Sequence, residues 1–257
     1  MARIDESRPF LPVNIAILTV SDTRSEADDK SGQTLIDLLG RDGHRLAARA
    51  IVRDDIDAIV ARLRAWIADP AIDVVISTGG TGVTGRDVTP EAFRQVYDKE
   101  IEGFGELFRM ISWDKVKTSA LQSRATGGVA GGTYLFALPG SPSACRDGWE
   151  EILRWQLDNR FRPCNLVELM PRLTEKAGLD LVPHSWLTHL LTGYSLQLIA
   201  TLPRARYVEF NVSQSRLTGG IAQAPFELAE DGTITIPDTP GIGVTVDTAF
   251  IAAHRVN

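Results

Sequence analysis

The stretch that most constrains this chain is VVISTGGTGVTGRDVTP, residues 74–90. The segment from Ile72 to Ser77 is apolar and rich in β-branched residues, which predicts a buried central strand. Four glycines follow it, and they let backbone N–H groups approach a ligand closely, because no Cβ stands in the way. Thr89 as an N-cap and Pro90 at the first helical position predict the start of a helix. A strand, a glycine loop and a helix N-terminus in this order favour an anion site, and phosphate fits best.

Two phosphate-binding fingerprints match this stretch only in part. Gly80 to Asp87 resembles a Walker A loop up to its second glycine, but Arg86 and Asp87 stand where Lys and Ser or Thr should be. Residues 80–85 also form a literal GxGxxG, yet they follow about the third predicted strand instead of the first. The plainer interpretation is a glycine-rich turn with no ligand. Asp87 argues against it, because a carboxylate beside a phosphate loop needs a cation between them, which implies Mg²⁺.

Composition narrows the class of protein. The chain has 257 residues, of which 44% are hydrophobic and 23% charged, as is ordinary for a globular protein. A net charge of −6 argues against a nucleic-acid binder, which needs a basic face. Cys145 and Cys164 make no metal-binding spacing and no disulfide framework. The N-terminal MARIDESRPF has no apolar core and no apolar run approaches membrane length, so we expect a cytoplasmic protein with no membrane partner.

Predicted strands and helices alternate along the first two thirds of the chain. Apolar runs predict strands at residues 13–19, 46–52, 72–77 and 133–138. Helical spacing or helix-start signals predict helices at residues 32–40, 56–67, 90–98, 103–111 and 142–159, the last with Ser141 as its N-cap. Residues 113–132 are rich in Ser, Thr and Gly and are expected to be irregular. Alternation of this kind predicts an α/β fold, a doubly wound and mostly parallel sheet.

Polar or glycine-containing loops follow four of the predicted strands. They are Ser21-Asp22, Asp54-Asp55, the glycine loop from Gly79 to Asp87, and Gly140-Ser141. Ligands of such sheets bind outside the carboxyl ends of the strands, so these loops should converge on one edge. That convergence favours a nucleotide-type site over a bare glycine turn.

The candidate side chains each have a functional and a structural interpretation. Asp54 and Asp87 are candidates to share a Mg²⁺ ion that also holds phosphate oxygens. Asp54 is equally placed to cap the next helix, although Asp55 directly precedes that helix and is the better cap. Arg86 and Arg124 are candidate phosphate clamps or, on the plainer view, solvated surface residues. The hydroxyls of Ser21 and Ser141 are candidates to bind a phosphate or a ring, or they satisfy local turns.

Five ordered motifs in residues 10–172 resemble the MoaB/MogA family of molybdenum-cofactor biosynthesis proteins. The motifs are LTVSDTR (18–24), STGGTGVTGRDVTPEA (77–92), EIEGFGELFRMIS (100–112), SALQSRA (119–125) and FALPGSPSACRDGWE (136–150). The segment QLDNRFRPCNLVELMPRL (156–173) is closer to the MoaB branch. The resemblance implies the molybdopterin-binding fold over residues 1–175.

The resemblance also implies an activity. Members of the family bind molybdopterin, and some adenylylate its terminal phosphate with Mg-ATP, releasing pyrophosphate. By motif, Asp54 and Asp87 are expected to be catalytic and to bind Mg²⁺. The parts expected to hold pterin and nucleotide are Ser21, Asp22, Thr78, Gly79, Gly80, Thr81, Gly82, Gly140 and Ser141, with Arg124 as a phosphate ligand. A homotrimer or hexamer is implied, and the alternative function is a non-catalytic molybdopterin carrier or scaffold.

The last third of the chain differs. Residues 179–247 resemble the C-terminal end of an enolase-superfamily enzyme of the mandelate-racemase type, on VPHSW, ATLPRARYVEF and IPDTPGIGVTVD. We therefore expect a small α+β extension over residues 176–257, with strands at 179–183 and 207–210, a helix at 185–201 and a hairpin at Asp231-Gly232. His184 falls where many members place a catalytic base. The segment lacks the preceding strands and metal carboxylates of a complete barrel, so we expect no enolase-type activity.

Overall fold

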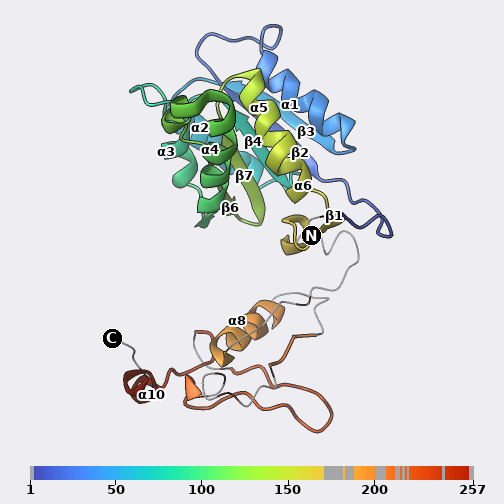
Figure 1. The fold of residues 1–257 in the computed structure, drawn as a ribbon, viewed down its shortest axis with the longest axis vertical. Coiled ribbons are helices and arrows are strands. Elements are labelled where there is room, and N and C mark those ends of the chain that lie inside the picture. Colours follow the sequence, from blue (N-terminus) through green and yellow to red (C-terminus); the bar gives the residue numbers. More distant parts are fainter. Residues whose placement is uncertain are drawn as a thin grey trace. The chain divides into compact units, whose positions relative to one another are not determined.

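The computed structural model describes residues 3–170, 182, 188–200, 207–211, 215, 218, 220–238 and 241–254 (Figure 1). The chain divides into two compact units, Met1–Leu173 and Thr174–Asn257. We describe each unit by itself.

A six-stranded sheet in the order β3-β2-β4-β7-β6-β5 forms the centre of the first unit (Figure 1). The bounds are β2 (Asn14–Val20), β3 (Arg45–Val52), β4 (Val74–Thr78), β5 (Lys99–Glu100), β6 (Thr126–Ala130) and β7 (Thr133–Leu138). The first four strands in that order run parallel, and β6 and β5 pair antiparallel at one edge. The expected α/β class with a mostly parallel sheet is confirmed. A separate antiparallel pair joins β1 (Arg3–Ile4) to β8 (Phe161–Arg162).

Helices cover both faces of this sheet (Figure 1). Their bounds are α1 (Lys30–Arg41), α2 (Ile56–Ile67), α3 (Thr89–Arg94), α4 (Glu102–Val116), α5 (Pro142–Gly148) and α6 (Arg154–Gln156), with short helical turns η1 (Lys117–Gln122), η2 (Trp149–Leu153) and η3 (Val167–Leu169). Successive residues of β2 point to opposite faces, as a strand requires. Ile15 and Ile17 join a core with α1, α4 and α5, whereas Ala16 and Leu18 join a core with α2 and α3. Burial on both faces explains the continuous apolar runs of these strands.

Two of the three predicted helix caps are confirmed. Asp55 begins α2, where its carboxylate accepts from the Ala58 N–H at 2.9 Å, and Ser141 begins α5, where its hydroxyl accepts from the Ala144 N–H at 3.2 Å. The predicted cap at Thr89 is wrong. Val88 occupies the N-cap position of α3, and the Thr89 hydroxyl donates instead to the Gly79 carbonyl at 2.9 Å. A long-range acceptor in the glycine loop thus replaces the local capping bond.

The expectation of irregular chain over residues 113–132 is wrong. The helix α4 continues to Val116, η1 follows, and β6 pairs with β7. Gly127 and Gly128, which suggested a loop, are strand residues. A Cβ at Gly127 would lie 2.9 Å from Phe136, and one at Gly128 would overlap the Tyr97 ring. Glycine is needed in β6 because aromatic side chains pack directly on its backbone.

The second unit contains α8 (His189–Ala200) and α10 (Thr248–Ala253) within its described residues, which agrees with the helix expected at 185–201. The strand expected at 207–210 is wrong, because that segment has no strand pairing. At Asp231-Gly232 the chain turns, with Gly232 at φ 79° and the Ala229 N–H donating to Thr233 O at 2.9 Å, but no ladder flanks the turn in the described residues. His184 and, apart from Val182, the strand expected at 179–183 lie outside the described residues. Within the described ranges, every helix falls short of the length and apolar character needed to cross a bilayer.

Candidate active site

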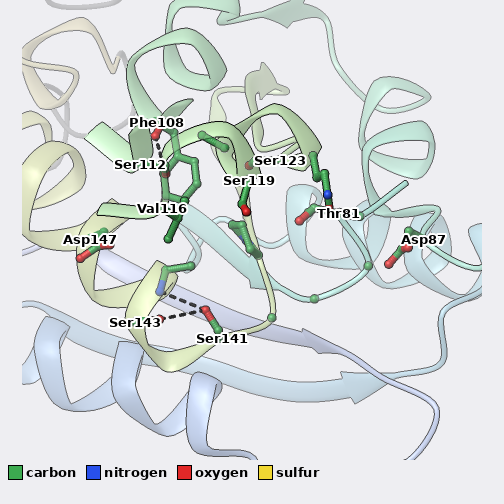
Figure 2. Close-up of a pocket in the computed structure, with 18 of the residues that line it drawn as sticks. Thr81, Asp87, Phe108, Ser112, Val116, Ser119, Ser123, Ser141, Ser143 and Asp147 are labelled. Carbon is green, nitrogen blue, oxygen red and sulfur yellow. Dashed lines mark hydrogen bonds between the residues drawn. The ribbon is translucent and has the colours of Figure 1, made fainter. Parts of the chain in front are cut away.

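The candidate site lies where the strand order of the sheet reverses. The chain passes from β2 to β3 on one side and then returns to β4 on the other side of β2. The loops after β2 and β4 therefore separate at the carboxyl edge, which is where doubly wound sheets form a crevice. A cavity of about 570 Å³ opens there, lined by both loops and by the loop after β7 (Figure 2).

The glycine loop is tightly held against its neighbours. Gly79 and Gly80 have φ of 106° and 64°, in the left-handed region that disfavours any side chain. A Cβ at Gly79 would overlap the Val20 carbonyl oxygen, and one at Gly80 would overlap the Thr89 hydroxyl. Gly140, from the loop after β7, lies so close to Gly79 that a Cβ added at Gly140 would be 3.2 Å from Gly79 Cα. The loop therefore requires glycine at these positions for close packing of three strand ends.

Three carboxylates gather beside this loop. The Asp54 carboxylate accepts from the Val88 N–H at 3.3 Å, and the Asp54 N–H donates to Asp22 Oδ1 at 3.3 Å. Arg86 pairs with Asp22. Burial raises the pKa of Asp54, and the negative charges of Asp87 and Asp22 raise it further. The carboxylates of Asp22, Asp54 and Asp87, which come from different loops, therefore lie close enough to repel one another.

Asp87 has the opposite electrostatic environment from Asp54. The hydrogen bond from the Thr84 hydroxyl is the main reason that the pKa of Asp87 is lowered, and the Thr84 N–H also donates to Asp87 Oδ2 at 2.9 Å. A Cβ at Gly80 would lie 2.8 Å from Asp54 Oδ1, and one at Gly82 would lie 2.7 Å from Asp87 Oδ2. Both carboxylates therefore lie directly against the glycine loop. Asp87 also lines the cavity, whereas Asp54 flanks the loop outside the lining.

This donor set fits Mg²⁺ held jointly with phosphate. Mg²⁺ is commonly bound by one or two carboxylates together with substrate phosphates and water. Asp54 and Asp87 supply two such carboxylates beside the glycine loop. Across the part of the chain that the structure describes, no group of three or more His, Cys, Asp or Glu side chains could enclose a metal by itself. Metal binding by Asp54 and Asp87 stays a prediction.

The remaining predicted residues fall into two groups. The cavity is lined by the predicted residues Ser21, Gly79, Gly80, Thr81, Gly82, Gly140 and Ser141. Thr78 does not line the cavity. Its buried hydroxyl donates to Pro139 O at 3.0 Å and accepts a hydrogen bond from the Cys145 thiol at 3.1 Å. Arg124 does not line it either, because its guanidinium contacts Gly82 O, Asp87 O and the Glu91 carboxylate. For both groups, contact with a ligand stays a prediction.

Sequence reasoning missed one whole wall of the cavity. It comes from α4, from η1 and the residue after it, and from α5, and it includes Phe108, Ser112, Lys115, Val116, Ser119, Ser123, Ser143 and Asp147. Lys115 pairs with Asp147, and Figure 2 shows Asp147 and Asp87 at opposite ends of the cavity. The missed signal was the helical spacing of Phe108, Ser112 and Lys115, which continues past Ile111, where the predicted helix ends.

Comparisons with known proteins find relatives for both parts of the chain. A family model described as "Probable molybdopterin binding domain" matches residues 16–159, and a model described as "Enolase C-terminal domain-like" matches residues 170–250. Molybdenum cofactor biosynthesis protein B of Escherichia coli K12 is 52% identical over 159 residues, which cover 62% of this chain and 94% of that protein.

Two solved structures of similar proteins have the same fold. A crystal structure of molybdenum cofactor biosynthesis protein B has a TM-score of 0.57 at 44% identity, covering 58% of this chain and 94% of that one. The tungsten cofactor synthesizing protein MoaB from Pyrococcus furiosus has a TM-score of 0.51 at 36% identity, covering 55% and 91%. Since the first family model spans more than half of the chain and the relative aligns over nearly its whole length, the chain belongs to the family of probable molybdopterin binding domains, with an enolase C-terminal-like segment after it.

Proposed function

We propose that the protein acts in molybdenum cofactor biosynthesis by binding molybdopterin and transferring the adenylyl group of ATP to its terminal phosphate. The relatives named above carry molybdenum or tungsten cofactor synthesis in their names. The observation that carries the catalytic part is the convergence of Asp54 and Asp87 on the glycine loop at the edge of the cavity. A carrier of a phosphorylated pterin has no need for two mutually repelling carboxylates beside its phosphate loop.

The reaction gives each part of the site a role. A phosphate oxygen of molybdopterin forms a bond to the α-phosphorus of ATP, and the bond from that phosphorus to the pyrophosphate leaving group breaks. The N–H groups of Gly80 and Thr81, which line the cavity, would donate to phosphate oxygens, whereas the Gly82 N–H donates to the Asp87 carboxylate. Asp54 and Asp87 would hold Mg²⁺, which when bound neutralises the charge on the phosphates. The wall formed by α4 and η1 would shield the reacting groups from water.

The decisive assay combines the protein with molybdopterin, ATP and Mg²⁺ and measures adenylylated pterin and pyrophosphate. Asp87→Asn should lower turnover about 100- to 1,000-fold, the usual loss when one charge-stabilising group is removed. Binding of molybdopterin should survive in this variant. Asp57→Asn is the matched control, because Asp57 is an exposed acid in the first turn of α2.

Two outcomes would contradict the proposal in different ways. Wild-type turnover by Asp87→Asn at saturating Mg-ATP would remove the carboxylate from the mechanism. Pterin binding by the wild-type protein without pyrophosphate release would favour the carrier or scaffold. We also propose a homotrimer or hexamer, and light scattering after gel filtration tests that assembly.

A further inference from the structure

Arg124 binds the glycine loop at two points, Gly82 and Asp87. Its Nε donates to the Gly82 carbonyl at 2.6 Å, and its Nη2 donates to the Asp87 carbonyl. Its own backbone N–H donates to the Thr81 carbonyl at 3.2 Å. One residue that follows η1 therefore spans the loop segment that runs from Gly82 to Asp87.

The third guanidinium nitrogen of Arg124 pairs with the Glu91 carboxylate, in the first turn of α3. Burial alone would raise the pKa of Glu91, but the hydrogen bond from Arg124 holds that pKa below its usual value. The Glu91 carboxylate is ionised at neutral pH as a result. The charge of Arg124 is thus balanced by the protein itself and is directed at backbone carbonyls.

Neither Arg124 nor Glu91 lines the cavity, whereas Gly82 and Asp87 both do. A phosphate clamp has to face its ligand, whereas the guanidinium of Arg124 is engaged by two loop carbonyls and by Glu91. Within the loop, the Asp87 carboxylate accepts from the Thr84 N–H at 2.9 Å, and the Asp87 N–H donates to Thr84 O at 3.1 Å. The loop is therefore fixed internally by Thr84 and externally by Arg124.

We propose that Arg124 and Glu91 form a positioning pair that holds the loop from Gly82 to Asp87, and with it the Asp87 carboxylate, in its working geometry. This inference rests on the proposed adenylyl transfer. Within that reaction it gives Arg124 the role of holding the loop, in place of the phosphate-binding role predicted from the sequence. Nε, Nη1 and Nη2 each contact a different acceptor. Only the planar fork of arginine offers donors in these three directions, and a lysine ammonium cannot reproduce them.

The test compares Arg124→Ala, Arg124→Lys and Glu91→Gln with the control Arg94→Ala. Arg94 lies on α3, as Glu91 does, and like Arg124 it pairs with a glutamate, Glu100; neither Arg94 nor Glu100 lines the cavity. Hydrogen–deuterium exchange of residues 82–88 is the readout that needs no activity. Exchange should rise at least about tenfold in both Arg124 variants, as expected for loss of a charge-assisted hydrogen bond, and stay unchanged in the control.

Kinetics provide the second readout. Both Arg124 variants should lower kcat about 100-fold through misplacement of Asp87, with KM for ATP and molybdopterin affinity nearly unchanged. Glu91→Gln should show a smaller effect in the same direction. Recovery of activity in Arg124→Lys, or a raised KM for ATP with unchanged loop exchange, would overturn the positioning role and restore the phosphate clamp. If the wild-type protein is inactive, the adenylyl transfer fails as a proposal, while the exchange data still decide whether Arg124 holds the loop.

Discussion

The substitution Gly80→Ala tests whether the close packing of the glycine loop is needed for both stability and function. Gly80 has φ of 64°, and an alanine Cβ there would overlap the Thr89 hydroxyl and lie 2.8 Å from Asp54 Oδ1. The Thr89 hydroxyl would have to leave the Gly79 carbonyl, to which it now donates at 2.9 Å. The substitution therefore disturbs a buried hydrogen bond and a predicted catalytic carboxylate together.

The expected loss of stability follows from two costs. A non-glycine residue in the left-handed region costs about 1–2 kcal/mol. Loss of the hydrogen bond from the Thr89 hydroxyl to Gly79 adds about 1 kcal/mol. The free energy of unfolding of the first unit should fall by about 2–3 kcal/mol, which lowers its Tm by about 4–12 °C for a domain of this size.

Thermal unfolding followed by circular dichroism measures this change, with two glycine variants from the same loop for comparison. Gly85 has no neighbour within 4 Å of an added Cβ, so Gly85→Ala should leave Tm and turnover unchanged. At Gly82 an added Cβ would lie 2.7 Å from Asp87 Oδ2, without a positive φ. Gly82→Ala should therefore keep most of the stability and lose activity. Equal Tm values for Gly80→Ala and Gly85→Ala would refute the packing account.

Two further predictions concern acid stability and the C-terminal segment. Burial lowers the pKa of His44 to about 4, so the folded state disfavours its protonated form. The contribution of neutral His44 to the free energy of unfolding should be complete above pH 6.5 and should be lost as the pH falls towards 4. Urea unfolding of His44→Gln at a series of pH values should lack this part of the pH dependence. Identical pH profiles for the wild-type protein and the variant would contradict the prediction. Deletion of residues 176–257 should leave a folded, active and more soluble protein, because the first unit has its own core and contains the whole cavity. Calorimetry, gel filtration and the adenylylation assay check this, and unfolding or loss of assembly in the shortened chain would show that the segment is integral.

Much of the fold was predictable because its signals are local. The apolar runs of the four parallel strands and the caps Asp55 and Ser141 depend on residues within one strand or one helical turn. The order of strands and polar loops also predicted that Asp22, Asp54 and Asp87 would converge, since parallel strands bring their carboxyl ends to one edge. The assignment of residues 113–132 failed, because glycines in a strand look like a loop until the aromatic rings that pack on them are known.

Backbone preference and hydrophobic spacing act over a few residues, so the sequence alone predicts a strand, a glycine loop and a helix at the carboxyl edge of a parallel sheet. The roles of the polar side chains at that edge depend on tertiary packing. The Thr89 hydroxyl binds Gly79 instead of capping α3, and Arg124 binds carbonyls that lie 42 and 37 positions earlier in the chain. A hydrogen bond depends on the distance and direction between two groups, and for residues far apart in sequence those are set by the packing of the sheet and its helices.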